Sequence, residues 1–244
     1  MHLTLRQASS YLDVSEPTVR RWIATRGLPS HRVNERLHCN AIELWEWATA
    51  NGIPVSKGLL DKARDEPEDM REDVPPLSEL LAEGGVHRDL GGGSRTEALR
   101  EVVASLPLPA DLDRDFLFTV LDARETMGST AIGDGIAIPH VRNPILLHVE
   151  RPFLALCLLE HPVDFGALDG QPVGALFVVV SPNVPAHLKI LARLAFILRD
   201  QRLRSLLRDR AGSEAILGRI AALEASGLGG PGALGAARTP RKTR

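Results

Sequence analysis

Cysteine is scarce in this sequence. Cys39 and Cys157 are the only two among 244 residues, and neither belongs to a Cys-x-x-Cys pair. We therefore expect both to be reduced, structural thiols. The histidines of the second half are also too widely spaced for a compact zinc motif, so no metal site is expected.

Long apolar runs are missing as well. Hydrophobic residues make up 44% of the chain, yet no run of about 18 of them is present to cross a bilayer. The opening "MHLTLRQASSYLDV" has no basic segment followed by an apolar one, as a secretory leader would. These absences predict a soluble, cytoplasmic protein without membrane insertion.

No glycine motif for nucleotides is complete. "GDGIAI" supplies two glycines of a dinucleotide fingerprint, but Ile138 replaces the third and Pro139 prevents the required helix. "GGGS" at 91–94 lacks the Lys-Ser/Thr pair of a phosphate-binding loop and is interpreted as a flexible lead-in to a helix. We expect no cofactor.

Charge is present, but it is unevenly distributed. The net charge of −2 combines a basic stretch at 15–36, with five arginines and two glutamates, and an acidic stretch at 61–73, with seven acids and three bases. A single core usually occupies about 100 to 200 residues, so the length favours two units. We predict a first unit over 1–51, an acidic linker over 52–76, a second unit over 77–225 and a disordered tail over 226–244.

Helix-capping signals organise the first unit. Thr4 and Gln7 have capping-box spacing and predict a helix over about 5–12. Ser15 is a good N-cap for a second helix, which Gly27 and the proline after it terminate. Two short helices joined by a tight turn are typical of a helix-turn-helix, whose second helix enters the major groove.

Several polar residues of this unit are candidates for DNA contact. "HRVNERLH" predicts a hairpin wing after the second helix, and Asn40 and Glu43 have capping-box spacing for a third helix. Short polar side chains and arginines near the start of a reading helix can reach base edges, while other arginines neutralise phosphates. The predicted contact residues are Thr18, Arg20, Arg21, Arg32 and Arg36.

Residues 3–48 resemble a known DNA-binding module. The core "V-S-x-x-T-V-x-R-W" and the exit "G-L-P" are similar to the excisionase-type, MerR-like winged helix-turn-helix. The resemblance implies binding to duplex DNA, and the shortness of one reading helix is typical of a homodimer. The alternative is a helical interaction module whose arginines form a solvated face.

The second unit alternates helices with short apolar strands. Helices are predicted from the Ser94 cap to about 105 and over about 113–126, and "AIGDGIAI", "FLALCLL" and "ALFVVV" are interpreted as strands. Three amphipathic helices close the unit. The predicted fold class is α/β, with a mixed-sheet sandwich in the second unit and a small winged helix-turn-helix in the first.

Residues 77–223 resemble the IIA domain of the phosphoenolpyruvate-dependent sugar phosphotransferase system, in its fructose/mannitol and nitrogen-regulatory (PtsN-like) class. The segments that carry this resemblance are "ARETMGSTAIGDGIAIPHVR", "PVDFGALDGQPVGALFVVVSP" and "AHLKILARLAFILRD". It implies that His140 is the phosphorylated nucleophile, with Arg124 and His187 beside it. The hydroxyls of Ser129 and Thr130 are candidate donors to the phosphoryl oxygens. Val141 departs from the glycine that commonly follows the histidine.

Three functions remain open from the sequence. The first is a DNA-binding regulator that the histidine phosphocarrier protein of the same system phosphorylates on His140. The second is a phosphocarrier IIA component that relays the group to a sugar permease. The third is a degenerate IIA-like module that binds a partner without being phosphorylated.

Overall fold

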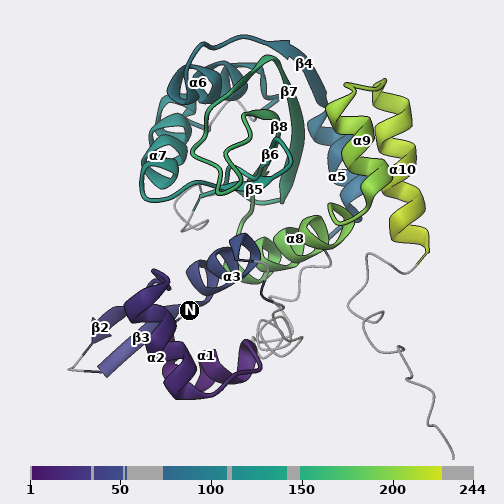
Figure 1. Cartoon of the computed structure of the whole chain (residues 1–244). Helices are drawn as coiled ribbons and strands as arrows, with labels where there is room; N and C mark the ends of the chain where they lie inside the picture. The colour runs from purple at the N-terminus through teal and green to yellow at the C-terminus, as the bar shows by residue number, and fades with distance from the viewer. Residues whose placement is uncertain are drawn as a thin grey trace, which may run out of the picture.

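The computed structural model describes residues 2–33, 36–51, 53, 74–108, 112–141 and 149–226. The predicted turn at Asn34-Glu35 lies outside these residues, as do almost all of the predicted linker and tail. Figure 1 shows two units that meet where helix α3 (Ala41–Ala50) lies against helix α8 (Val184–Ile197).

The first unit is a helix-turn-helix with a small antiparallel sheet. The Thr4–Gln7 capping box is confirmed, since the Gln7 amide donates to Thr4 and the Gln7 side chain accepts from the Thr4 amide. Ser15 caps the second helix, as its spacing predicts. The sheet has the order β1-β3-β2, in which β1 was not predicted because three residues carry no readable alternation. The remaining elements are α1 (Leu5–Tyr11), α2 (Glu16–Thr25), β1 (His2–Thr4), β2 (His31–Val33) and β3 (Arg36–Asn40).

The second unit is built on a five-stranded mixed sheet. Its strand order is β4-β7-β8-β6-β5, with parallel pairs β4/β7 and β6/β8 and antiparallel pairs β7/β8 and β5/β6. The strands are β4 (Val86–Leu90), β5 (Ala131–Gly133), β6 (Ile136–Ala137), β7 (Phe153–Val163) and β8 (Val173–Val180). The other helices are α5 (Leu77–Gly84), α6 (Arg95–Ser105), α7 (Arg114–Thr126), α9 (Gln201–Arg208) and α10 (Ser213–Ala225).

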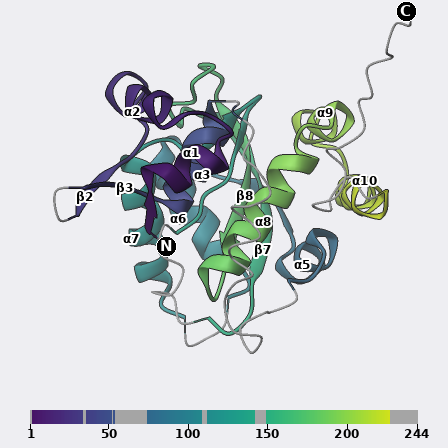
Figure 2. The same ribbon diagram turned by 90° about the horizontal axis from the view of Figure 1, so that it is seen from below.

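Helices cover both faces of this sheet, as Figures 1 and 2 show. Successive residues of a strand point to opposite faces, so each central strand supplies two cores. On β7, Leu154 and Leu156 join the core under α5 and α8, whereas Ala155 and Cys157 join the core under α6 and α7. Strands buried on both faces read as continuous apolar runs, which is why "FLALCLL" and "ALFVVV" were recognisable.

One predicted strand is a hairpin. "AIGDGIAI" forms β5 and β6, joined by Asp134 and Gly135, which adopt φ angles of 52° and 73°. Positive φ at both central positions is the requirement of a type I′ turn, and Asp-Gly meets it. The prediction of a single strand was therefore wrong, and the turn brings Ile136 back beside Gly133.

The sequence reading also missed α5 and β4. Strand β4 is only half-buried and mostly polar, so its sequence "VHRDL" has no strand pattern. At the last residue of α5, a Cβ on Gly84 would lie 2.0 Å from the Leu154 carbonyl oxygen, so glycine is required for this close approach.

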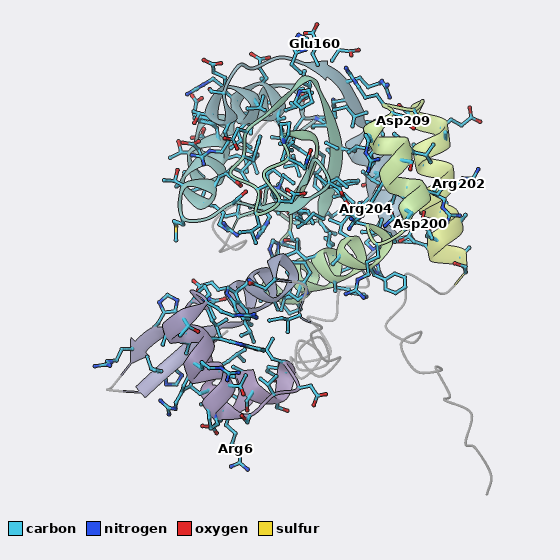
Figure 3. All side chains as sticks on the ribbon, viewed as in Figure 1. Arg6, Glu160, Asp200, Arg202, Arg204 and Asp209 are labelled. Atoms are coloured by element: carbon cyan, nitrogen blue, oxygen red, sulfur yellow. The ribbon has the colours of Figure 1, made fainter. Side chains whose placement is uncertain are left out.

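Charged side chains fasten the outer helices. The Glu224 carboxylate on α10 accepts hydrogen bonds from the backbone amides of Leu77 and Ser78, at the start of α5. Asp200, labelled in Figure 3, caps α9 and accepts two hydrogen bonds from Arg219 of α10, at 2.9 and 2.5 Å. These contacts join α10 to the start of α5 and to the start of α9.

Candidate functional site

His140 lies directly beyond β6, where the strand continues along β8. A parallel bridge pairs it with Val179, and the Val179 amide donates to the Pro139 carbonyl oxygen at 3.0 Å. The His140 Nδ1 atom lies 2.6 Å from the Ile138 carbonyl oxygen. A carbonyl oxygen only accepts hydrogen bonds, so Nδ1 carries the proton, and a neutral ring then has its lone pair on Nε2.

His187 lies in the first turn of α8 and faces His140. The two ring centroids are 5.2 Å apart, with the rings tilted by 48°. His187 Nδ1 is 2.8 Å from the hydroxyl oxygen of Ser181, which lies just beyond the end of β8. Both histidines are buried, with exposed fractions of 3% for His140 and 1% for His187. The fold thus brings together two histidines that are 47 positions apart in the sequence.

The N-terminus of α8 makes this place favourable for an anion. Asn183 caps the helix by accepting from the Ala186 amide, and the backbone amides of the first turn point toward the end of the helix that carries His187. The aligned peptide dipoles place about half a positive charge there. A negatively charged group bound between the two histidines would gain from this field.

The loop from α7 to β5 carries the other predicted site residues. Arg124 is buried, and its Nη1 donates to the Gly128 carbonyl oxygen at 2.7 Å. The Ser129 hydroxyl oxygen accepts from the Ala131 amide at 3.1 Å, so its own hydrogen is available for donation. The Thr130 hydroxyl, in contrast, donates to Glu125 Oε2 at 2.6 Å. The hydroxyl hydrogen of Thr130 is therefore already engaged in a hydrogen bond within the loop.

Glu125 makes buried contacts in this loop that sequence reasoning missed. Its buried carboxylate accepts from both the amide and the hydroxyl of Thr130. The Thr130 carbonyl oxygen in turn accepts from the Ile138 amide at 3.1 Å, and Ile138 is the residue whose carbonyl holds the His140 ring. A chain of hydrogen bonds thus runs from Glu125 to His140.

Val141 packs away from the histidines. It is 1% exposed and belongs to the core under α6 and α7, on the opposite side of the strand from His140. Its side chain therefore packs into that core and does not cover the imidazole. Arg142, which follows, lies outside the described residues.

The predicted DNA-contact residues occupy one unit but differ in exposure. Arg20 and Arg21 on α2 and Arg32 on β2 are exposed, while Thr18 is half-buried with its hydroxyl 3.0 Å from that of Ser15. The side chain of Arg36 lies outside the described part of the chain. Arg6 on α1, which sequence reasoning did not select, is also exposed and points away from the second unit (Figure 3).

Within the described residues, no three His, Cys, Asp or Glu side chains gather closely enough to bind a metal ion. The two thiols are buried, and burial raises the pKa of Cys39 to about 11 and that of Cys157 to about 12. Both therefore stay protonated at neutral pH. None of the helices in the described ranges is long and apolar enough to cross a membrane.

Comparison with known families matches both units. Residues 79–222 match the family described as "Phosphoenolpyruvate-dependent sugar phosphotransferase system, EIIA 2", and residues 3–52 match a helix-turn-helix domain. The first match takes in both histidines and the whole α7–β5 loop. The second takes in α1, α2 and α3.

Individual relatives match somewhat more than half of this chain. A nitrogen regulatory protein of Bradyrhizobium diazoefficiens is 37% identical over 143 residues, which cover 58% of this chain and 92% of the relative. One from Pseudomonas aeruginosa is 38% identical over 144 residues, covering 57% and 91%. The crystal structure of the nitrogen regulatory protein IIA-Ntr from Neisseria meningitidis superposes with a TM-score of 0.52 at 29% identity, covering 59% of this chain and 98% of that one.

Proposed function

This chain belongs to the phosphoenolpyruvate-dependent sugar phosphotransferase system EIIA 2 family, and from that premise we propose that it is a DNA-binding regulator phosphorylated on His140. The phosphoryl donor is the histidine phosphocarrier protein of the same system. The observation that carries the proposal is the His140–His187 pair, with Nδ1 of His140 fixed on the Ile138 carbonyl oxygen.

The hydrogen bond at Nδ1 selects the attacking atom. Because Nδ1 holds the proton, the nucleophile is the lone pair on Nε2 of His140. It attacks the phosphorus in line, the bond between phosphorus and the donor's histidine nitrogen breaks, and that electron pair returns to the donor's imidazole. The product is a phosphohistidine on this chain. Positive charge that develops on the His140 ring is stabilised by the carbonyl oxygen that already accepts from Nδ1.

The surroundings supply charge stabilisation for the transferred group. His187 stands close enough to donate a hydrogen bond to a phosphoryl oxygen, and the α8 N-terminus adds its dipole. Arg124 and the Ser129 hydroxyl are proposed as further donors. Thr130 is assigned a different part, because its hydroxyl hydrogen is already bonded to Glu125.

The first unit is the proposed DNA-binding part of the chain. Arg20 and Arg21 project from α2, the helix that enters the major groove in this architecture, and Arg32 lies on the adjacent hairpin. These positive charges would displace counterions from duplex DNA on binding. A histidine acceptor and a DNA-reading helix in one chain support a regulator whose DNA binding follows the state of the phosphotransferase relay.

Phosphorylation of His140 can be tested directly. The full chain is incubated with phosphoenolpyruvate, enzyme I and the histidine phosphocarrier protein, and intact mass is recorded before and after acid treatment. We expect one acid-labile phosphoryl group in the wild type and in His161→Ala, a control histidine on the exposed end of β7. We expect none in His140→Ala. An unmodified wild type would favour a degenerate, non-phosphorylated module.

A further inference from the structure

Helix α3 is buried on more than one side. A helix at the surface of a small unit normally shows solvent a polar face. Here every described side chain of α3 is at most 8% exposed. Those side chains are Ala41, Glu43, Leu44, Trp45, Trp47 and Ala48. The helix is therefore packed between two layers, of which its own unit is only one.

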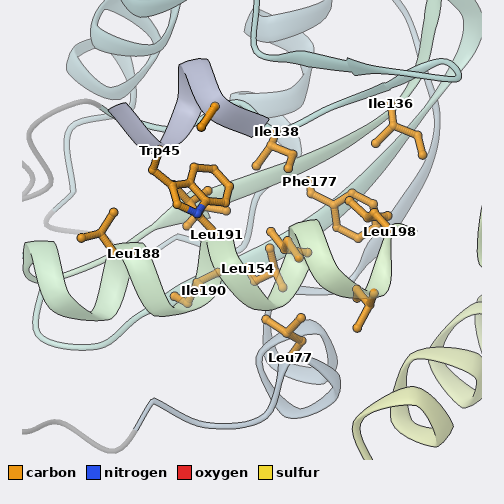
Figure 4. Close-up of a cluster of buried hydrophobic side chains, with 14 of the residues drawn as sticks. Trp45, Leu77, Ile136, Ile138, Leu154, Phe177, Leu188, Ile190, Leu191 and Leu198 are labelled. Carbon is orange, nitrogen blue, oxygen red and sulfur yellow. The ribbon is translucent and has the colours of Figure 1, made fainter. Parts of the chain in front are cut away.

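Trp45 and Trp47 show which layers these are. Successive helical residues are about 100° apart around the axis. Trp45 and Trp47 are two positions apart, so their side chains point about 200° apart, to opposite sides of the helix. The Trp47 indole donates to the Arg26 carbonyl oxygen at 2.9 Å, and its ring lies 5.3 Å from that of Trp22, within the first unit. Trp45 points the other way, and Figure 4 shows its ring beside α8 of the second unit, near Leu191.

The surface under Trp45 is formed by elements that also carry the histidine pair. Ile138, in the same buried cluster, precedes His140 by two residues and so faces the same side of its strand. Leu188 is the neighbour of His187, and Leu191 follows His187 by four residues, one turn along the same helix face. Helix α3 also contacts β5, whose hairpin partner leads to His140. The first unit thus lies over the surface beside the nucleophile.

Transfer between two proteins requires access to His140. The phosphorus on the donor must come within bonding distance of Nε2, yet His140 is only 3% exposed. We propose that the face formed by β5 and the N-terminal half of α8 is a shared docking surface, for which α3 of this chain and the phosphocarrier protein compete. The inference rests on the proposed phosphorylation of His140 and adds its regulation.

The same geometry favours release of α3 in the phosphorylated state. A phosphoryl group adds about −1.5 to −2 charges at neutral pH. His187 and the α8 N-terminus stabilise that charge, but docked α3 would keep apolar side chains such as Trp45 near it and exclude water, which is unfavourable. The unmodified chain therefore favours docked α3, and the phosphorylated chain favours released α3.

Access to His140 can be measured without any phosphoryl donor. Diethyl pyrocarbonate acylates accessible imidazole nitrogens, and peptide mass spectrometry gives the rate at each histidine. The variants are Trp45→Ala and Leu188→Glu, which weaken the contact from either side. Leu217→Glu, which puts the same charge on α10, is the matched control. Exposed His161 is the internal reference in every sample.

We expect His140 to react more slowly than His161 in the wild type and in Leu217→Glu. In both interface variants its rate should rise at least about fivefold, the lower end of typical coupling, while circular dichroism shows a retained fold. Phosphorylation by the phosphocarrier protein should accelerate in parallel in Trp45→Ala, which leaves the docking surface on β5 and α8 unchanged. If wild-type His140 reacts as fast as His161, or if neither folded variant changes its rate, the shared docking surface is overturned. Faster acylation without any phosphorylation would leave the docking of α3 standing and remove the proposed function instead.

Discussion

Ser181 and His187 are joined by a hydrogen bond of 2.8 Å between two fully buried side chains, one at the end of β8 and the other in the first turn of α8. The bond fixes the orientation of the His187 ring toward His140. Because it engages Nδ1, the nitrogen that we propose donates to an incoming phosphoryl group is Nε2.

Removing this hydroxyl should slow phosphoryl transfer without unfolding the chain. For Ser181→Ala we predict a fall of about tenfold in the transfer rate at saturating phosphocarrier protein, as expected for losing about 1.4 kcal/mol of transition-state stabilisation. The half-saturating phosphocarrier concentration should stay the same, since Ser181 is buried away from the donor. Ser226→Ala, which removes a hydroxyl bonded to the Leu223 carbonyl oxygen on α10, is the control. An unchanged rate in Ser181→Ala would show that this bond does not position His187.

DNA binding should depend on the exposed arginines of α2. Arg21→Ala should weaken binding to duplex DNA and lower the slope of log affinity against log salt by about 0.9, the value for one lost phosphate contact. Arg202→Ala removes an exposed arginine from α9, remote from α2 (Figure 3), and should leave both quantities unchanged. Equal affinities for Arg21→Ala and the wild type would exclude Arg21 from the interface. Fluorescence anisotropy over a salt series gives both numbers.

The Asp200–Arg219 contact should make stability depend on acid pH. The hydrogen bond from Arg219 holds the pKa of Asp200 below its ordinary value of 3.8. The contribution to stability is therefore present above pH 3.8 and is lost as the pH falls through the lower, folded-state pKa. Asp200→Asn keeps a good N-cap for α9 but removes the charge. Its free energy of unfolding in urea should be lower than that of the wild type at pH 7, and the gap should close as acid protonates the wild-type carboxylate. A gap that stays constant with pH would contradict this assignment.

Local signals in the sequence predicted much of this fold. Thr4, Ser15 and Ser94 were recognised as helix caps because a cap bonds to an amide only three residues away, and all three make that bond. Interior strands were recognised because burial on both faces leaves a continuous apolar run. Strand β4 was missed because it is an edge strand, polar and half-buried.

The site was only partly predictable, for a related reason. His140 and His187 were placed together through resemblance to a family, since no local pattern joins residues 47 positions apart. The partners Ser181 and Glu125 were missed, because each acts through a contact set by tertiary packing. The contact of α3 with α8 joins two units, so a local sequence pattern does not predict it. The one local sign is the unusually apolar sequence of α3, "AIELWEWATA".

The most direct test of a phosphorylation-dependent regulator is DNA affinity at one fixed salt concentration. It should be measured for unmodified wild type, phosphorylated wild type, His140→Ala treated with the phosphorylation mixture, and unmodified Leu188→Glu. We predict two groups separated by at least about fivefold. Unmodified wild type and His140→Ala, in which α3 stays docked, form one group, and phosphorylated wild type and Leu188→Glu, in which α3 is released, form the other. A single affinity shared by all four samples would contradict the coupling of His140 to DNA binding.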